Sequence, residues 1–214
     1  MITRILKPLD DLISAKTYVD AYGGLAQQAV SVEEIEGSGV FNTAIFPVSM
    51  HTTGEECLSG NYSDMVPDAS RKSIFYFEGL TDLNFSEIPG QKQPARTSNA
   101  GRVATVDYRL VGWLNLPQLG ESEMISDLIV GDLLGSIHGK TIENPPYLPF
   151  VSKIKFKVIK QSNRDIKIFS RYSYGANMAL LLYPYDFFGL VVRAQITLKG
   201  GDCYNYEEGQ ALGC

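Results

Sequence analysis

The chain has 214 residues, of which 44% are hydrophobic and 20% charged, a composition typical of folded globular proteins rather than disordered ones. Its net charge of -5 at pH 7 argues against a protein built mainly to bind nucleic acid, because such proteins need a clustered basic surface. No signal peptide is evident, and no uninterrupted apolar run approaches the roughly 20 residues that span a bilayer. The cysteines lack metal-site spacing, which favours free thiols in a reducing compartment. We therefore expect a soluble cytoplasmic protein without a membrane partner.

The first third of the chain predicts a helix, then strands, then a loop. Apolar residues recur at helical spacing over 5–22, and Gly23-Gly24 suits the end of that helix. Loose alternation over 25–50 predicts two short strands, compatible with a hairpin. Pro47 places the second strand near an edge of the sheet, because proline donates no ladder hydrogen bond. Residues 51–72 are rich in small polar residues and predict a loop.

The middle of the chain predicts two strands separated by a long irregular stretch. Residues 73–78, SIFYFE, form a short aromatic strand candidate. Residues 79–102 are punctuated by prolines and are locally basic, and we expect an arm that orders against a neighbouring subunit. Residues 103–116 alternate strictly and predict a strand. Trp113, the only tryptophan, lies on the otherwise polar parity of this strand, which indicates a covered surface.

The second half continues the same mixture of strands and helices. The expected elements are a helix over 122–137, an extended connector over 141–150, a strand over 151–160, a short helix within 162–174 and a strand over 187–199. In the last strand, one parity is wholly apolar: Phe188, Leu190, Val192, Ala194, Ile196 and Leu198. Together these elements predict one α+β domain over residues 1–214, an antiparallel sheet with two or three helices packed on one face. Residues 202–214 complete it as a loose tail.

Candidate catalytic, cofactor-binding and metal-ligating residues form no recognisable set. His51 and His138 are far apart in sequence, and Glu55 and Cys57 lack the second ligand pair of a metal site. The glycine pairs do not match a phosphate-binding loop. We therefore expect neither an enzyme nor a cofactor or metal site.

Basic and aromatic residues are the candidates for an interaction surface. Lys153, Lys155 and Lys157 share one parity of a predicted strand. Three interpretations remain open: a solvated face or protected sheet edge, a surface for an acidic neighbouring subunit, or direct contact with DNA. The candidate interface residues are Lys92, Arg96 and Arg102 in the long loop, Trp113, the lysines Lys153, Lys155 and Lys157, and the aromatic residues Tyr183 and Tyr185.

The segments MITRILKPLDDLISAKTYVDAYGGLAQ and VPDASRKSIFYFEG are similar to structural proteins in phages of gut Bacteroidota. The order of predicted elements also resembles the head–tail connector and tail-terminator proteins of tailed bacteriophages. This resemblance is architectural, covers most of the chain and assigns no functional residue. It implies a virion protein that forms a ring of its own copies and contacts portal, connector or tail proteins. DNA would pass through the ring without specific binding.

Two other functions remain open from the sequence. The chain could be a structural component of a phage-derived contractile injection system, which would differ only in its genomic neighbours. It could instead be an enzyme or small-ligand-binding protein with a pocket between sheet and helices, for which His51, Glu55 and Cys57 are the candidate polar groups.

Overall fold

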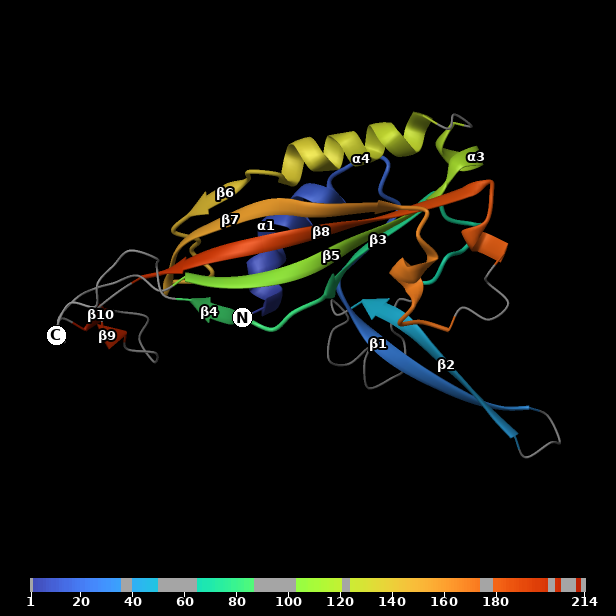
Figure 1. The fold of residues 1–214 in the computed structure, drawn as a ribbon, viewed down its shortest axis with the longest axis horizontal. Coiled ribbons are helices and arrows are strands. Elements are labelled where there is room, and N and C mark those ends of the chain that lie inside the picture. The colour runs from blue at the N-terminus through green and yellow to red at the C-terminus, as the bar shows by residue number, and fades with distance from the viewer. Residues whose placement is uncertain are drawn as a thin grey trace.

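A single mixed sheet forms the centre of the molecule (Figure 1). The computed structural model describes residues 2–35, 40–49, 65–86, 103–120, 124–173, 179–199, 203–204 and 211–212. Its helices are α1 (Ile2–Ser14), α3 (Leu116–Leu119), α4 (Met124–Ile137) and the 3-10 helix η1 (Ile166–Phe169). Its strands are β1 (Ala21–Ile35), β2 (Val40–Ser49), β3 (Ser73–Gly79), β4 (Asn84–Ser86), β5 (Val103–Asn115), β6 (Thr141–Glu143), β7 (Val151–Asn163), β8 (Tyr185–Leu198), β9 (Cys203–Tyr204) and β10 (Ala211–Leu212).

The strand order in the main sheet is β2-β1-β3-β5-β8-β7-β6, and β4 also pairs with β5. The central pair is antiparallel, and its register runs from Val103 opposite Thr197 to Asn115 opposite Tyr185. The predicted α+β class is thereby confirmed, and the sheet is mostly antiparallel. One detail differs from the sequence-based expectation, because β1 and β3 run parallel. The predicted hairpin of β1 and β2 is present, and β2, which contains Pro47, is an edge strand as expected.

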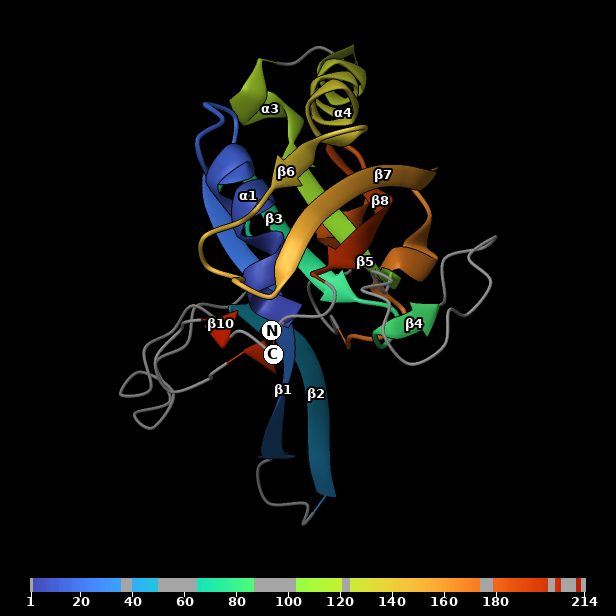
Figure 2. The same ribbon diagram turned by 90° about the vertical axis from the view of Figure 1, so that its left-hand side faces the viewer.

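Helices α1 and α4 lie on the same face of the sheet (Figures 1 and 2). The apolar parity of β8 predicted from the sequence is buried beneath them, together with the matching parity of β5. The residues that α1 and α4 contribute to this core are Ile5, Leu6, Leu9, Ile13, Ile129, Val130, Leu133 and Ile137. Burial of these side chains on one face explains why α1 is amphipathic in sequence, whereas α4 also carries the exposed apolar residues Met124 and Leu128.

A second apolar core lies on the other face of the sheet, at one end only. Trp113 is 1% exposed there and packs in the same cluster as Ile168 and Leu181. Its indole Nε1 donates to the Leu180 carbonyl at 2.7 Å, and its ring stacks on Tyr185 with 5.2 Å between ring centroids. The aromatic residue on the polar parity of β5 is therefore covered by residues of its own chain.

The predicted helix over 5–22 is too long, because α1 ends at Ser14 and β1 begins at Ala21. The Gly23-Gly24 pair lies within β1 and coincides with a register shift between Tyr22 and Leu25. Gly24 has φ +59°, and a Cβ at Gly23 would lie 2.7 Å from the Met65 side chain. These glycines therefore allow the backbone of β1 to form an irregularity at this point. In sequence, a glycine pair of this kind is also typical of a helix end.

Smaller corrections concern the other helices and the connector. The apolar spacing of α4 predicts that Leu128 packs in the core, but Leu128 is 66% exposed. Val130 is buried in the core instead. The short helix of 162–174 is only η1, and Asp165 caps it by accepting from the Lys167 amide. A helix in this segment predicts that Ile166 and Phe169 pack inward, but Ile166 is exposed, whereas Ile168 and Phe169 are buried. The connector over 141–150 contains the short strand β6.

Candidate functional site

The hairpin of β1 and β2 projects from the body of the molecule (Figures 1 and 2). Strand β1 pairs with β3 only from Ala21 to Leu25. From Ala26 opposite Ser49 to Ile35 opposite Val40, the described strands β1 and β2 pair only with each other. A two-stranded hairpin is at best marginally stable in water without a third strand or a covering helix. The outer part of this hairpin therefore lacks the support that the rest of the sheet provides.

The base of the hairpin is held by backbone hydrogen bonds from two other segments. The Met65 amide donates to the Pro47 carbonyl at 2.9 Å, and the Ser173 amide donates to the Ile45 carbonyl at 2.7 Å. Val48 is buried at this base, whereas Val30, farther along β1, is 58% exposed. Burial thus decreases along the hairpin away from the sheet.

The hairpin has an acidic sequence. Strand β1 contains Glu33 and Glu34 in its outer half, and residues 21–49 contain no lysine, arginine or histidine. At neutral pH this projecting element therefore carries negative charge and no compensating positive charge of its own.

A row of lysines lies near the other edge of the sheet, on strand β7. Lys153, Lys155 and Lys157 lie opposite Thr197, Gln195 and Arg193 of β8. Because directly opposite residues of paired strands share a face, these lysines lie on the face that α1 and α4 leave uncovered. The predicted common orientation of the three lysines is confirmed by this register.

A β-bulge extends the row by one residue. The register of β7 and β8 shifts between Val158 and Lys160, so that Lys160 lies opposite Val191. Without this bulge, alternation would place Lys160 on the same face as Phe156 and Val158, which pack in the core under the helices. We call Lys153, Lys155, Lys157 and Lys160 together the lysine row.

The lysine row carries a surplus of positive charge. Lys153 pairs with Glu143 of β6, with 2.8 Å between Nζ and Oε1. Lys155, Lys157 and Lys160 are exposed and form no ion pair within the described residues. The neighbouring Arg193 is already paired, because its Nε and Nη2 donate to the two Asp107 oxygens at 2.7 and 2.8 Å. These hydrogen bonds raise the pKa of Arg193.

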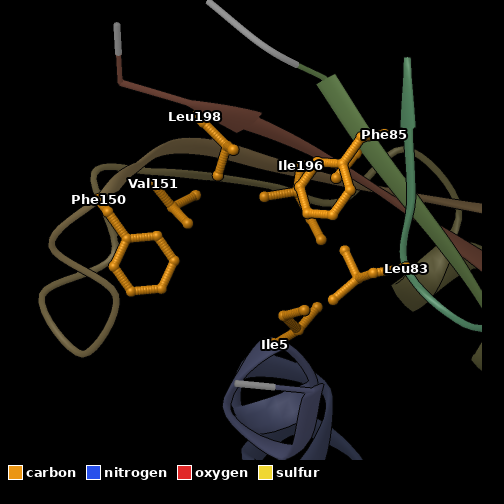
Figure 3. Close-up of a pocket in the computed structure, with 8 residues that line it drawn as sticks. Ile5, Leu83, Phe85, Phe150, Val151, Ile196 and Leu198 are labelled. Carbon is orange, nitrogen blue, oxygen red and sulfur yellow. The ribbon is translucent and has the colours of Figure 1, made fainter. Parts of the chain in front are cut away.

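An apolar pocket of about 140 Å³ lies between α1 and one end of the sheet (Figure 3). The described residues that line it are all apolar: Ile5, Leu83, Phe85, Ala104, Phe150, Val151, Ile196 and Leu198. Phe85 is 62% exposed at this pocket. Ligand sites usually combine an apolar wall with a few polar groups that orient the ligand, and this pocket offers none among its lining residues.

A polar depression of about 380 Å³ lies at the opposite end of the sheet. Its lining includes Arg164, whose Nε and Nη2 donate to the two Asp186 oxygens at 2.9 and 3.2 Å. The buried Asp186 carboxylate also accepts from the Phe187 amide at 2.8 Å. Three donors therefore fix this carboxylate, which fits a structural role better than proton transfer.

The aromatic and basic residues predicted as an interface are not brought together. Tyr183 is 79% exposed, whereas Tyr185 is partly buried against Trp113, which has no surface to offer a neighbour. Lys92, Arg96 and Arg102 lie outside the described residues, and so do His51, Glu55 and Cys57. His138 lies at the end of α4, where its amide donates to the Leu134 carbonyl.

Neither the described residues nor comparison with known proteins assigns a chemical activity to this chain. Among the described residues, no group of three or more His, Cys, Asp or Glu side chains could hold a metal ion. In the same part of the chain, no helix has the length and apolar character needed to cross a membrane. No known protein family model matches the chain, and no curated protein matches its sequence significantly.

Proposed function

We propose that this protein is a structural component of a tailed-phage virion, a ring-forming protein of the neck or tail. The observation that carries the proposal is the projecting hairpin, whose outer pairs have no third strand among the described residues. Strand pairs of this kind gain stability when another surface covers them or extends them. A neighbouring subunit would supply that surface in an assembled particle.

The arrangement of the sheet supports assembly from head to tail. The hairpin occupies one end of the strand order and β7-β6 the other end, so each chain offers two different surfaces. A contact between two different surfaces repeats from copy to copy and forms a ring when the rotation closes. In this proposal the partners are other copies of the chain, together with portal, connector or tail proteins at the two sides of the ring.

Size-exclusion chromatography with light scattering and electron microscopy of the purified chain would test the proposal. We expect oligomers that grow with protein concentration and rings of uniform diameter. A variant in which an Asn-Gly turn replaces residues 31–44 keeps the base of the hairpin, including the Ile45 carbonyl, and should remain folded but monomeric. A wild-type chain that stays monomeric at every concentration would contradict the proposal.

A further inference from the structure

We infer that the lysine row of one copy is the surface that receives the projecting hairpin of the next copy. This inference rests on the proposed ring and names the contact that would build it. Among the described residues the outer hairpin has no third strand and Lys155, Lys157 and Lys160 have no acidic partner, so each surface can supply what the other lacks.

The lysine row and the hairpin carry opposite charges. Lys155, Lys157 and Lys160 are exposed without an ion pair among the described residues. Residues 21–49 contain the acidic residues Glu33, Glu34 and Glu36 and no basic residue. The net charge of the whole chain is -5, so three neighbouring lysines without an ion pair among the described residues are an exception that fits an acidic partner.

The bulge in β7 lengthens the lysine row. Bulges redirect side chains at the edges of sheets, and this one brings Lys160 to the face that already carries Lys157. The result is a longer continuous row, suited in length to an extended partner such as a β-ribbon. A row that only protected the sheet edge from unwanted pairing would not need this fourth lysine on the same face.

The hairpin and the lysine row lie near opposite ends of the strand order. In Figures 1 and 2 the hairpin extends on the side of the molecule away from β7 and α4. The strand order likewise separates β2 from β7 by four strands, β1, β3, β5 and β8. The hairpin therefore cannot cover the lysine row of its own chain, and the contact must join different copies.

DNA is the other polyanion that a lysine row could bind, and the structure favours the protein partner. The row is flanked by the carboxylates of Glu143 and Asp107, both held close by ion pairs. These carboxylates neutralise Lys153 and Arg193, so the positive charge without an ion pair among the described residues is confined to Lys155, Lys157 and Lys160, a smaller basic surface than DNA-binding proteins present.

Charge reversal tests the contact. The variants are K155E/K157E in the row, E33K/E34K in the hairpin and K72E/K167E as the control, which reverses two exposed lysines elsewhere. Each is assayed by concentration-dependent light scattering, with circular dichroism to verify folding. We expect K155E/K157E and E33K/E34K each to raise the dissociation constant of assembly by at least about tenfold, the lower end for close interfacial charge pairs. The control should assemble like the wild type.

A mixture of the two interface variants gives the decisive result. In that mixture, wild-type hairpins meet wild-type rows and reversed hairpins meet reversed rows, so assembly should return. A wild-type oligomer that K155E/K157E leaves unchanged would overturn this contact but not the ring. A monomeric wild type would overturn both, and tight DNA binding lost only in K155E/K157E would assign the row to DNA instead.

Discussion

Glu78 on β3 and Arg109 on β5 lie opposite each other, with 3.4 Å between Arg109 Nη1 and Glu78 Oε2. Glu78 is 2% exposed, and burial raises the pKa of its carboxyl, although Tyr172, Arg109 and Arg171 act in the opposite direction. Arg109 Nη1 also donates to the Ile168 carbonyl at 3.2 Å. This pair thus connects the sheet to η1 on the face without α1 and α4.

The raised pKa of Glu78 predicts that its ionisation destabilises the fold. Because the folded state holds this proton more tightly than the unfolded state, stability from Glu78 is fully present below its ordinary pKa of 4.5 and is lost as pH rises through the folded pKa. We expect Glu78→Gln to raise the free energy of unfolding by about 1 kcal/mol at pH 8. Urea unfolding at pH 4 and pH 8 should show this gain only at pH 8. A loss of stability at pH 8 would mean that the pairing with Arg109 outweighs the cost of burial.

Asp132 on α4 predicts the opposite dependence on pH. Its carboxylate accepts from Lys16 Nζ at 2.8 Å and from the Tyr18 hydroxyl at 2.7 Å, and these hydrogen bonds lower its pKa. Stability from Asp132 is therefore present above its ordinary pKa of 3.8 and is lost as pH falls through the folded pKa.

We expect Asp132→Asn to lower the free energy of unfolding at pH 7 by about 1 kcal/mol, since solvent screens this exposed pair. The measurement is thermal unfolding between pH 2 and pH 7, in which the difference from the wild type should shrink on the acid side. Asp82→Asn, at an exposed aspartate in the loop before β4, is the control and should leave the melting temperature within experimental error. Equal effects of both substitutions would contradict a specific role for Asp132.

Gly112 on β5 predicts a strong steric effect. A Cβ at Gly112 would lie 2.4 Å from Phe188 Cζ and 2.9 Å from Phe75 Cε1, inside the main core. We expect Gly112→Ala to lower the free energy of unfolding by about 1–3 kcal/mol, because the aromatic rings must shift in a packed core. Gly131→Ala in α4 is the control, since nothing lies within 4 Å of its added Cβ, and it should be neutral or stabilising. Chemical denaturation of both variants would check this, and equal stability would contradict the packing.

The sequence predicts the body of this fold well because its strands alternate clearly. The apolar parity of β8 and the common face of Lys153, Lys155 and Lys157 follow directly from a period of two. Apolar residues at helical spacing predict the helices α1 and α4, but they do not predict the residues at which these helices begin and end. Gly23-Gly24 shows why, since a glycine pair marks a bulge and a helix end equally well.

The candidate site was less accessible to sequence reasoning. The strands of the hairpin were predictable, but their projection depends on where β3 stops pairing with β1, and that is set by tertiary structure. The face on which Lys160 lies depends on the β-bulge in β7. The local sequence does not predict this bulge, because Ile159 and Lys160 are equally compatible with a regular strand. The sequence shows that residues 21–49 contain no basic residue. This absence indicates an interaction surface only once the structure shows that these residues form a projecting hairpin.

Trp113 offers an internal measure of folding for all of these variants. It is the only tryptophan, 1% exposed, and its Nε1 donates to the Leu180 carbonyl. We expect fluorescence emission typical of a buried indole, which shifts to longer wavelength on unfolding. Trp113→Phe removes the hydrogen bond and leaves the carbonyl unpaired, which should lower the free energy of unfolding by about 1–3 kcal/mol. Because Trp113 is covered by its own chain, neither assembly nor K155E/K157E should change its emission, and a shift on assembly would place it at the interface after all.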